Sequence, residues 1–405
     1  MSPEVTAAVI AGGVGIVTVI ATVIVQIVGF RSTKANTEQQ IKATHKDTAD
    51  TLGHQREQLD RTLAEQRTRT LNERFAMAAD QLGSDKPAVR LAGVYAMAGL
   101  ADDWVENRQT CVDVLCAYLR MPYEPDSGRE APEPGRLAFQ AIREVRHTVI
   151  RVITVHLRDD AAVSWQGLNF DFTGVVFDGG DFRGAEFSGG LAIFDGAEFS
   201  GVVRFFGAMF SGGEVRFDDA VFSGGEVRFD HAQFSGGTVS FRRAKFTGGE
   251  ISFERAVFSG STVNFVEAEF SGGTVIFDLA LFSGGVADFG HAQFSGGEVS
   301  FGSTVFDGGG VYLLARFCGG KVSFPEAQFA SGVVSFNLSS FSGGKVDFPE
   351  ALFIGGEVSF NHASFRGGEV DFSHAFDWSY PPSFPWTDTP PSSVKLPRKE
   401  GQSNA

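Results

Sequence analysis

The stretch VRFDDAVFSGGE, at residues 215–226, carries the pattern that decides the fold of this protein. It contains Phe217 and Phe222, and a small apolar residue lies two positions before each of them. The motif recurs along the chain, so that phenylalanines are separated by alternating steps of five and seven residues as far as Phe372. One repeated unit therefore accounts for a composition of 41 Phe and 50 Gly in 405 residues.

The spacing of the apolar residues is typical neither of a helix nor of a long half-buried strand. Only two residues of each short stretch are apolar, and a polar or glycine-rich turn such as residues 211–213 follows them. Each stretch therefore points two side chains inward and then turns a corner, where glycine can supply a positive φ. Two steps of five residues and two of seven close one square coil. Stacked coils are expected about 4.8 Å apart, with each Phe on its equivalent in the next coil.

Two irregularities interrupt the repeat. One residue is missing between Phe199 and Phe205. Another is missing around residues 311–317, where Tyr312 or Leu313 replaces the expected phenylalanine. The spacing resumes at once after both, so we expect local kinks and no break in the coil.

The pattern [A/V]-x-F-x-x, over about residues 164–376, resembles that of the pentapeptide-repeat family. The resemblance implies a right-handed quadrilateral β-helix. The central residue of the family is more usually leucine, whereas this chain uses phenylalanine almost throughout and adds two-residue glycine insertions. Some members that share this pattern inhibit DNA gyrase by mimicking DNA, so the resemblance also makes gyrase inhibition an alternative function.

Residues 6–30 form an uncharged, apolar run that is long enough for a transmembrane helix. A signal peptide is disfavoured, because residues 1–5 contain Glu4 and no Lys or Arg. Arg31 and Lys34 follow the run, and basic residues favour the cytoplasmic side. We therefore expect a single-pass cell-membrane protein with its N-terminus outside and the bulk of the chain in the cytoplasm. With this anchor, the chain resembles the membrane-anchored pentapeptide-repeat proteins of bacteria.

Residues 31–83 are polar and free of proline, and Ile41, Leu52 and Leu63 recur in them every eleven residues. An eleven-residue repeat keeps one stripe aligned on a nearly straight helix. The segment is predicted to be a stalk helix, either paired in a coiled coil or solvated as a single helix. Residues 84–160 show further helical periodicity and are predicted to form a small helical unit.

The last helix of that unit is predicted over about residues 136–158. Its Arg143, Arg146, Arg151 and Arg158 lie mainly away from its apolar face. Such a basic face can contact membrane lipid or an acidic partner, or it can be solvated beside the acidic β-helix.

The sequence thus predicts an α + β protein with a transmembrane helix, a helical unit and a quadrilateral β-helix. Its predicted parts are the N-terminus (1–5), the transmembrane helix (6–30), the stalk (31–83), the helical unit (84–160), the β-helix (161–376), an aromatic cap (377–388) and a disordered tail (389–405).

Nothing in the sequence indicates catalysis, because motifs for nucleophiles, zinc or nucleotide phosphates are absent. Cys111, Cys116 and Cys318 fit neither a disulfide framework nor a zinc site, so they are expected to be free buried thiols. The histidines of the repeat do not stack. We therefore expect no enzyme activity, no cofactor and no metal. The net charge of −15 also disfavours direct nucleic-acid binding.

One surface feature of the repeat favours protein binding. Val257, Leu281 and Val305 occupy the outward position just before a Phe on successive coils, so they should stack as one apolar stripe. Such a stripe often marks an interface, although three surface residues can also lie in a row without a role. The acidic residues form patchy columns, which disfavours the ordered charge of a DNA mimic. The preferred hypothesis is therefore a membrane-tethered scaffold for an unknown protein partner, with self-association left open.

Overall fold

The computed structural model describes residues 3–123 and 133–398, without the side chains of residues 3–17, 35, 133 and 134. The chain divides into two compact units, residues 1–73 and 74–405. The described residues of the first unit all belong to helix α1 (Pro3–Leu82), and the second unit contains the other helices and all the described strands.

Helix α1 runs for 80 residues. The apolar side chains of the eleven-residue repeat are about half exposed on it, at 51% for Ile41, 52% for Leu52 and 53% for Leu63. Where the structure describes side chains, no helix is long and apolar enough to span a membrane. The predicted transmembrane segment lies partly outside that region, because the side chains of residues 6–17 are not described.

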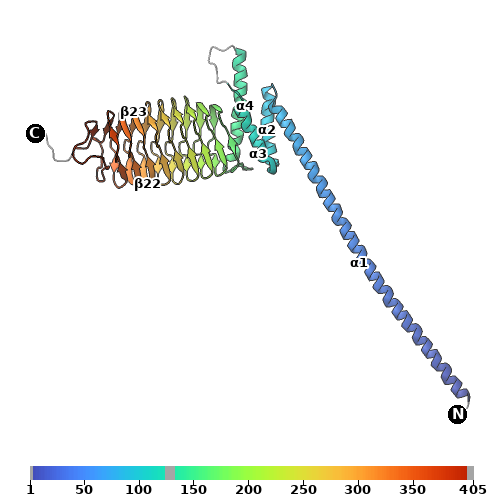
Figure 1. The fold of residues 1–405 in the computed structure, drawn as a ribbon. Coiled ribbons are helices and arrows are strands. Elements are labelled where there is room, and N and C mark those ends of the chain that lie inside the picture. Colours follow the sequence, from blue (N-terminus) through green and yellow to red (C-terminus); the bar gives the residue numbers. More distant parts are fainter. Residues whose placement is uncertain (1–2, 124–132, 399–405) are drawn as a thin grey trace. The chain divides into compact units, whose positions relative to one another are not determined.

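The helical unit consists of α2 (Pro87–Asp103), a short 3-10 helix (Val105–Asn107), α3 (Arg108–Arg120) and α4 (Glu133–Leu157). Its core contains Val94, Leu115 and Ile153, none of which is exposed to solvent. Gly93 lets the end of α1 pack closely on α2, because a Cβ atom there would lie 2.7 Å from the backbone nitrogen of Leu82. These helices cover the N-terminal end of the β-helix (Figure 1).

The rest of the chain is a parallel β-solenoid of about nine turns. The strands of its first half are β1 (Phe170–Asp171), β2 (Val176–Asp181), β3 (Glu186–Phe187), β4 (Leu191–Ile193), β5 (Glu198–Arg204), β6 (Met209–Phe210), β7 (Glu214–Arg216), β8 (Val221–Phe222), β9 (Glu226–Arg228), β10 (Gln233–Phe234), β11 (Thr238–Ser240), β12 (Lys245–Phe246), β13 (Glu250–Ser252), β14 (Val257–Phe258) and β15 (Thr262–Asn264). Those of its second half are β16 (Glu269–Phe270), β17 (Thr274–Ile276), β18 (Leu281–Phe282), β19 (Val286–Asp288), β20 (Gln293–Phe294), β21 (Glu298–Ser300), β22 (Val305–Tyr312), β23 (Arg316–Ser323), β24 (Gln328–Ser335), β25 (Ser340–Asp347), β26 (Leu352–Phe353), β27 (Glu357–Ser359), β28 (Ser364–Phe365), β29 (Glu369–Asp371) and β30 (Val394–Lys395).

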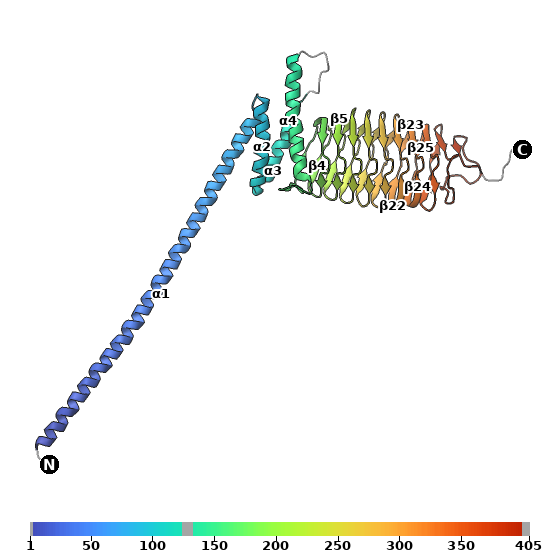
Figure 2. The ribbon, with the colours of Figure 1, turned by 180° about the vertical axis from the view of Figure 1, so that it is seen from behind.

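The predicted four-sided coil is confirmed by the strand register. Each regular turn contains four short strands, and each strand pairs in parallel with its equivalent on the next turn, as Val239 does with Val263. The four columns of strands join into two sheets of 15 strands. Figure 2 shows the stacked turns from behind. Phenylalanine rings stack along the axis as expected, with 4.7 Å between the ring centroids of Phe217 and Phe241 and 4.8 Å between those of Phe229 and Phe253.

Glycine in the seven-residue steps has a steric cause. A Cβ atom on Gly236 would lie only 2.4 Å from the carbonyl oxygen of Ser211 on the preceding turn. The backbone at the next position, Gly237, also has a φ of +70°, which favours glycine. The glycine pairs therefore allow the backbones of neighbouring turns to approach, and they introduce no helix that could bind a phosphate.

The structure resolves the irregularity at residues 311–317. Leu313 takes the place of the missing phenylalanine and is fully buried, whereas the Tyr312 side chain is 40% exposed. The Leu313 amide donates to the Ser335 carbonyl of the next turn, so the coil continues without a break. At the other irregularity, β2 and β5 stay paired across a bulge between Phe177 and Gly179.

The basic residues of α4 do more than form a solvated face, because several of them cover the open end of the β-helix. Arg146 is buried and donates hydrogen bonds to the carbonyl oxygens of Leu119 (2.7 Å) and Val176 (2.9 Å). Arg143 donates to the carbonyl of Asp178 (3.1 Å), and Arg158 to that of Arg183 (3.1 Å). The first turn has no preceding turn to supply amide donors, and these side chains take that role.

The opposite end is covered by aromatic residues. Trp378 packs edge-on against Phe353 and Phe372, and Phe384 stacks on Phe360 at 5.4 Å. In the segment assigned from the sequence to a disordered tail, Val394 and Lys395 form β30, which pairs with β29. Residues 399–405 of that predicted tail lie outside the described part of the chain.

The contact between α4 and β2 predicts a dependence of stability on pH. Asp178 accepts hydrogen bonds from Tyr123 (2.7 Å) and Arg143 (2.8 Å), and its carboxylate lies 3.0 Å from Nε2 of His147. Burial alone would raise the pKa of Asp178, but the hydrogen bonds from these residues lower it to about 2. The folded-state pKa is thus below the ordinary value of 3.8, so the stabilisation is present above that value and is lost as the pH falls towards 2.

We expect Asp178→Asn to lower the free energy of unfolding by about 1–2 kcal/mol at pH 7, and by much less near pH 2.5. Chemical denaturation of wild type and variant at the two pH values measures this difference. Glu144→Gln, an exposed change on the same helix, is the control. An equal loss of stability at both pH values would contradict the role given to the Asp178 charge.

Candidate interaction surface

The predicted apolar stripe has the expected register. Val257 pairs with Leu281, and Leu281 pairs with Val305, so the three residues lie on consecutive turns. Gln233 and Gln328 occupy the positions at the two ends of the stripe. Each of the three apolar side chains is half-buried. The stripe is therefore less accessible than the sequence suggests, and its role in binding stays a prediction.

A second column lies at the corner that follows Phe217 and its equivalents on later turns. We call it the corner ridge, and it consists of Asp218, Asp219, Arg242, Arg243, Val266, Glu267, Gly290, His291, Leu314, Asn337, Leu338, Asn361 and His362. Backbone hydrogen bonds hold its turns in line, for example from the Asp219 amide to the Arg242 carbonyl and from the Leu338 amide to the Asn361 carbonyl. No stripe through these positions is evident from hydrophobicity alone, because the residue types change along the ridge.

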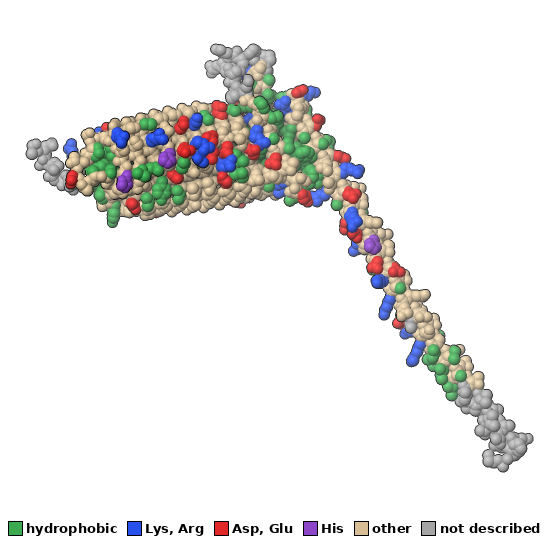
Figure 3. Space-filling view, in the orientation of Figure 1, with side chains coloured by type: hydrophobic (Ala, Val, Ile, Leu, Met, Phe, Trp, Pro, Cys, Tyr) green, Lys and Arg blue, Asp and Glu red, His purple; other side chains and the backbone are tan. Residues whose placement is uncertain are grey.

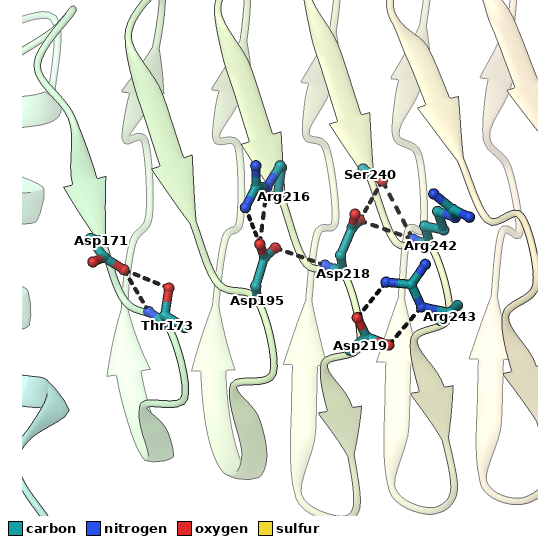
Figure 4. Close-up of polar contacts among 9 residues, drawn as sticks. All are labelled: Asp171, Thr173, Asp195, Arg216, Asp218, Asp219, Ser240, Arg242 and Arg243. Atoms are coloured by element: carbon teal, nitrogen blue, oxygen red, sulfur yellow. Dashed lines mark hydrogen bonds and ion pairs between the residues drawn. The ribbon is translucent and has the colours of Figure 1, made fainter.

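The half of the ridge nearest the helical unit is charged (Figure 4). Arg243 donates from Nε to the Asp219 carboxylate at 2.8 Å, and its pKa is raised by that hydrogen bond. Asp218 accepts from the Ser240 hydroxyl and from the Arg242 amide on the next turn. Acidic groups here are paired across turns with cations and hydroxyls. This half of the ridge therefore lacks the unbroken line of negative charge that a DNA mimic needs.

The C-terminal half of the ridge contains two leucines, Leu314 and Leu338, among asparagines and histidines. Leu338 is 64% exposed and Leu314 is half-buried, and Tyr312, which lies just before the ridge on the same turn as Leu314, is 40% exposed. We call these three residues the ridge patch. Figure 3 shows the face of the β-helix on which charged side chains gather towards the helical unit and hydrophobic ones lie beside two histidines. The patch occurs at the turn where one residue is missing from the repeat, so an irregularity in the sequence coincides with an exposed apolar surface.

Leu338 is at an unfavourable position for its residue type. Its φ is 62°, in the left-handed region, which costs a non-glycine residue about 1–2 kcal/mol. Twelve described non-glycine residues share this corner conformation, and most of them are polar or charged. An exposed leucine gains little from burial to offset that cost. Local conflicts of this kind are found most often at functional sites.

Other features of the described residues do not form a catalytic or metal site. No group of three or more His, Cys, Asp or Glu there could hold a metal ion. Cys111 and Cys116 are buried, and burial raises the pKa of Cys111 to about 11 and of Cys116 to about 12. Cys318, however, is exposed, so the prediction of three buried thiols is wrong for this residue. It directly follows the buried Phe317 in β23, where the side chain points away from the core.

Comparisons with protein-family models, curated proteins and solved structures find no match for the chain. The solenoid, with about nine turns and a phenylalanine about every five residues, is consistent with the pentapeptide-repeat fold.

Proposed function

We propose that the protein is a non-catalytic, membrane-tethered scaffold of the pentapeptide-repeat type, whose β-helix binds a protein partner through the ridge patch. The observation that carries the proposal is the exposure of Leu338 at the corner of one turn and of Tyr312 just before the same corner of the preceding turn. A few residues, tyrosine prominent among them, supply most of the binding energy in protein interfaces, and a preformed surface lowers the cost of binding. A solenoid with a continuous core presents such a patch without a change in backbone conformation.

The membrane tether is supported by the uncharged run at residues 6–30 and by Arg31 and Lys34 directly after it. These residues favour an orientation with the β-helix in the cytoplasm. The exposed stripe of α1, formed by Ile41, Leu52 and Leu63, is a second surface that self-association could cover. We propose pairing of α1 only as a complement to the ridge patch.

Crosslinking and mass spectrometry of the full chain in native membranes test the proposal. We expect Leu338→Asp to reduce capture of the partner at least tenfold, because a central interface residue contributes about 2 kcal/mol or more. Aspartate tolerates the left-handed conformation, so the corner is retained. Leu279→Asp is a matched control, because Leu279 has a φ of 59° and is 44% exposed at the other corner.

The outcomes separate the candidate surfaces. Loss of the partner in Leu281→Arg, with normal capture by Leu338→Asp, would move the interface to the predicted stripe. Capture of DNA gyrase would replace the scaffold function with the inhibitor alternative. Equal capture by wild type, Leu338→Asp and Leu281→Arg would show that neither the ridge patch nor the predicted stripe binds a partner.

A further inference from the structure

A cleft lies between α4 and the first two turns of the β-helix, apart from the corner ridge. Its volume is about 690 Å³. One wall is a single face of α4, because the lining residues Arg143, His147, Arg151 and Arg158 follow the periodicity of a helix. The other wall is formed by β2 and β5 and by the turn between β2 and β3, and it contributes Arg183 and Arg204.

The lining of the cleft is basic, although the whole chain has a net charge of −15. It contains five arginines and two aspartates, Asp178 and Asp181, which gives a net charge of +3 with His147 neutral. Both aspartates already have partners. Asp178 is bound by Tyr123, Arg143 and His147, and Asp181 by Arg183 at 2.7 Å. The acidic groups therefore compensate only part of the positive charge.

Several donors of the cleft remain available. Arg204 is exposed, and its side chain has no hydrogen bond or ion pair with any described residue. The side chain of Arg158 is held only through Nε, which donates to a backbone carbonyl, so its terminal nitrogens are unused among the described residues. Arg151 is 55% exposed, and only its Nη2 has partners, the Thr148 hydroxyl at 2.8 Å and the Glu144 carboxylate at 3.4 Å, so its other nitrogens are unused among the described residues. Three guanidinium groups from two walls thus border one cavity with unused donors.

We propose that this cleft binds a small phosphate-bearing molecule. Guanidinium groups bind phosphate through two parallel hydrogen bonds, and they keep their charge at all physiological pH values. The volume of the cleft is within the range of about 300–1,000 Å³ that is typical of small-molecule sites. Binding would be favourable because the positive charge of the cleft is only partly compensated. A phosphate group would supply the hydrogen-bond acceptors that the unused arginine donors lack in the protein. This inference is independent of the scaffold function proposed above.

Isothermal titration of pyrophosphate into the full chain in neutral detergent micelles tests the proposal. We expect saturable binding that Arg204→Gln weakens about tenfold, the loss of one charge-assisted hydrogen bond. The double variant Arg151→Gln with Arg204→Gln should weaken it about a hundredfold. Arg316→Gln is the matched control and should bind as wild type does, because Arg316 is also exposed on the β-helix and its side chain has no partner among the described residues.

Two further titrations identify the source of the phosphate group. Dioctanoyl phosphatidic acid in the same micelles, if it competes with pyrophosphate and shows the same variant pattern, would assign the site to a lipid headgroup. Binding of pyrophosphate without such competition would assign it to a soluble phosphate compound. The proposal would be overturned if pyrophosphate did not saturate, or if Arg316→Gln weakened binding as much as Arg204→Gln. Tighter binding of single-stranded DNA with the same variant pattern would also overturn it, in favour of a nucleic-acid surface.

Discussion

Replacing Phe241 with alanine is expected to lower the free energy of unfolding of the β-helix by about 3–5 kcal/mol. The ring is fully buried and stacks between Phe217 and Phe265, at centroid distances of 4.7 and 4.8 Å. It also makes edge-to-face contacts with Phe229 and Phe253. Removal of the ring leaves a cavity that the rigid turns on both sides cannot close, so packing is lost in both directions along the axis.

The position of the cavity determines how this loss appears. In a solenoid each turn contacts only its neighbours. A destabilised turn in the interior can therefore let the turns before it and the turns after it unfold separately. We expect the thermal unfolding of Phe241→Ala to broaden or split into two transitions. Phe206→Ala is the control, because Phe206 is 46% exposed and should change stability little. A single transition at the wild-type temperature would contradict the continuous aromatic core.

The second large effect is expected for Arg146→Leu, which should destabilise the N-terminal end of the β-helix by about 2–5 kcal/mol. The variant leaves the carbonyl oxygens of Leu119, which is buried, and of Val176, which is partly buried, without their guanidinium donor, at a cost of up to about 1–3 kcal/mol each. It also removes the guanidinium group from the face of Tyr123, 4.1 Å from the ring centroid. Burial lowers the pKa of Arg146, and the neighbouring Tyr123 and Asp178 partly offset that lowering.

Native-state hydrogen exchange measures this effect locally. The amides of β2 and of the last turn of α3 should lose protection in Arg146→Leu, while those of β13 and β17 keep theirs. Arg151→Gln is the control on the same helix, because the Arg151 side chain is 55% exposed. Arg146→Lys should lie between the two, since an ammonium group cannot reach both carbonyl oxygens with the geometry of a guanidinium fork. Unchanged protection in Arg146→Leu would exclude the capping role.

The repeat itself could be predicted because its signal is redundant. Every regular turn of the β-helix contains the same residue types at the same spacing, so the four-sided coil and the stacking of rings follow from the phenylalanine positions alone. The phenylalanine positions could not show whether Tyr312 or Leu313 replaces the missing phenylalanine, because both residues are apolar and adjacent. Only the register with Ser335 on the next turn places Leu313 inside.

The roles of single residues depended on contacts between distant segments. The periodicity of α4 places Arg146 on the polar side of the helix, but it does not reveal that α3 and β2 close over that side. The ridge patch was missed for a related reason. Leu314 and Leu338 are 24 residues apart, the length of a regular coil, but this turn lacks one residue, so the register of β22 with β24 is 23 residues and places Leu314 over Asn337. Counting in regular coils therefore misaligns this part of the ridge. Such a search finds Val257, Leu281 and Val305, whose spacing is regular.

The close contact between Gly236 and the Ser211 carbonyl has a consequence for how the length of this protein can change. Every interface between regular turns is built from the same backbone contact and the same stacked rings, so a whole turn can be gained or lost without altering any neighbour. An insertion of half a turn would differ, because it would rotate all later turns by half a circuit and exchange the two corners. Only the insertion or deletion of whole turns thus preserves the surface pattern of the β-helix. One full turn of four strands is therefore the smallest insertion that leaves this pattern unchanged.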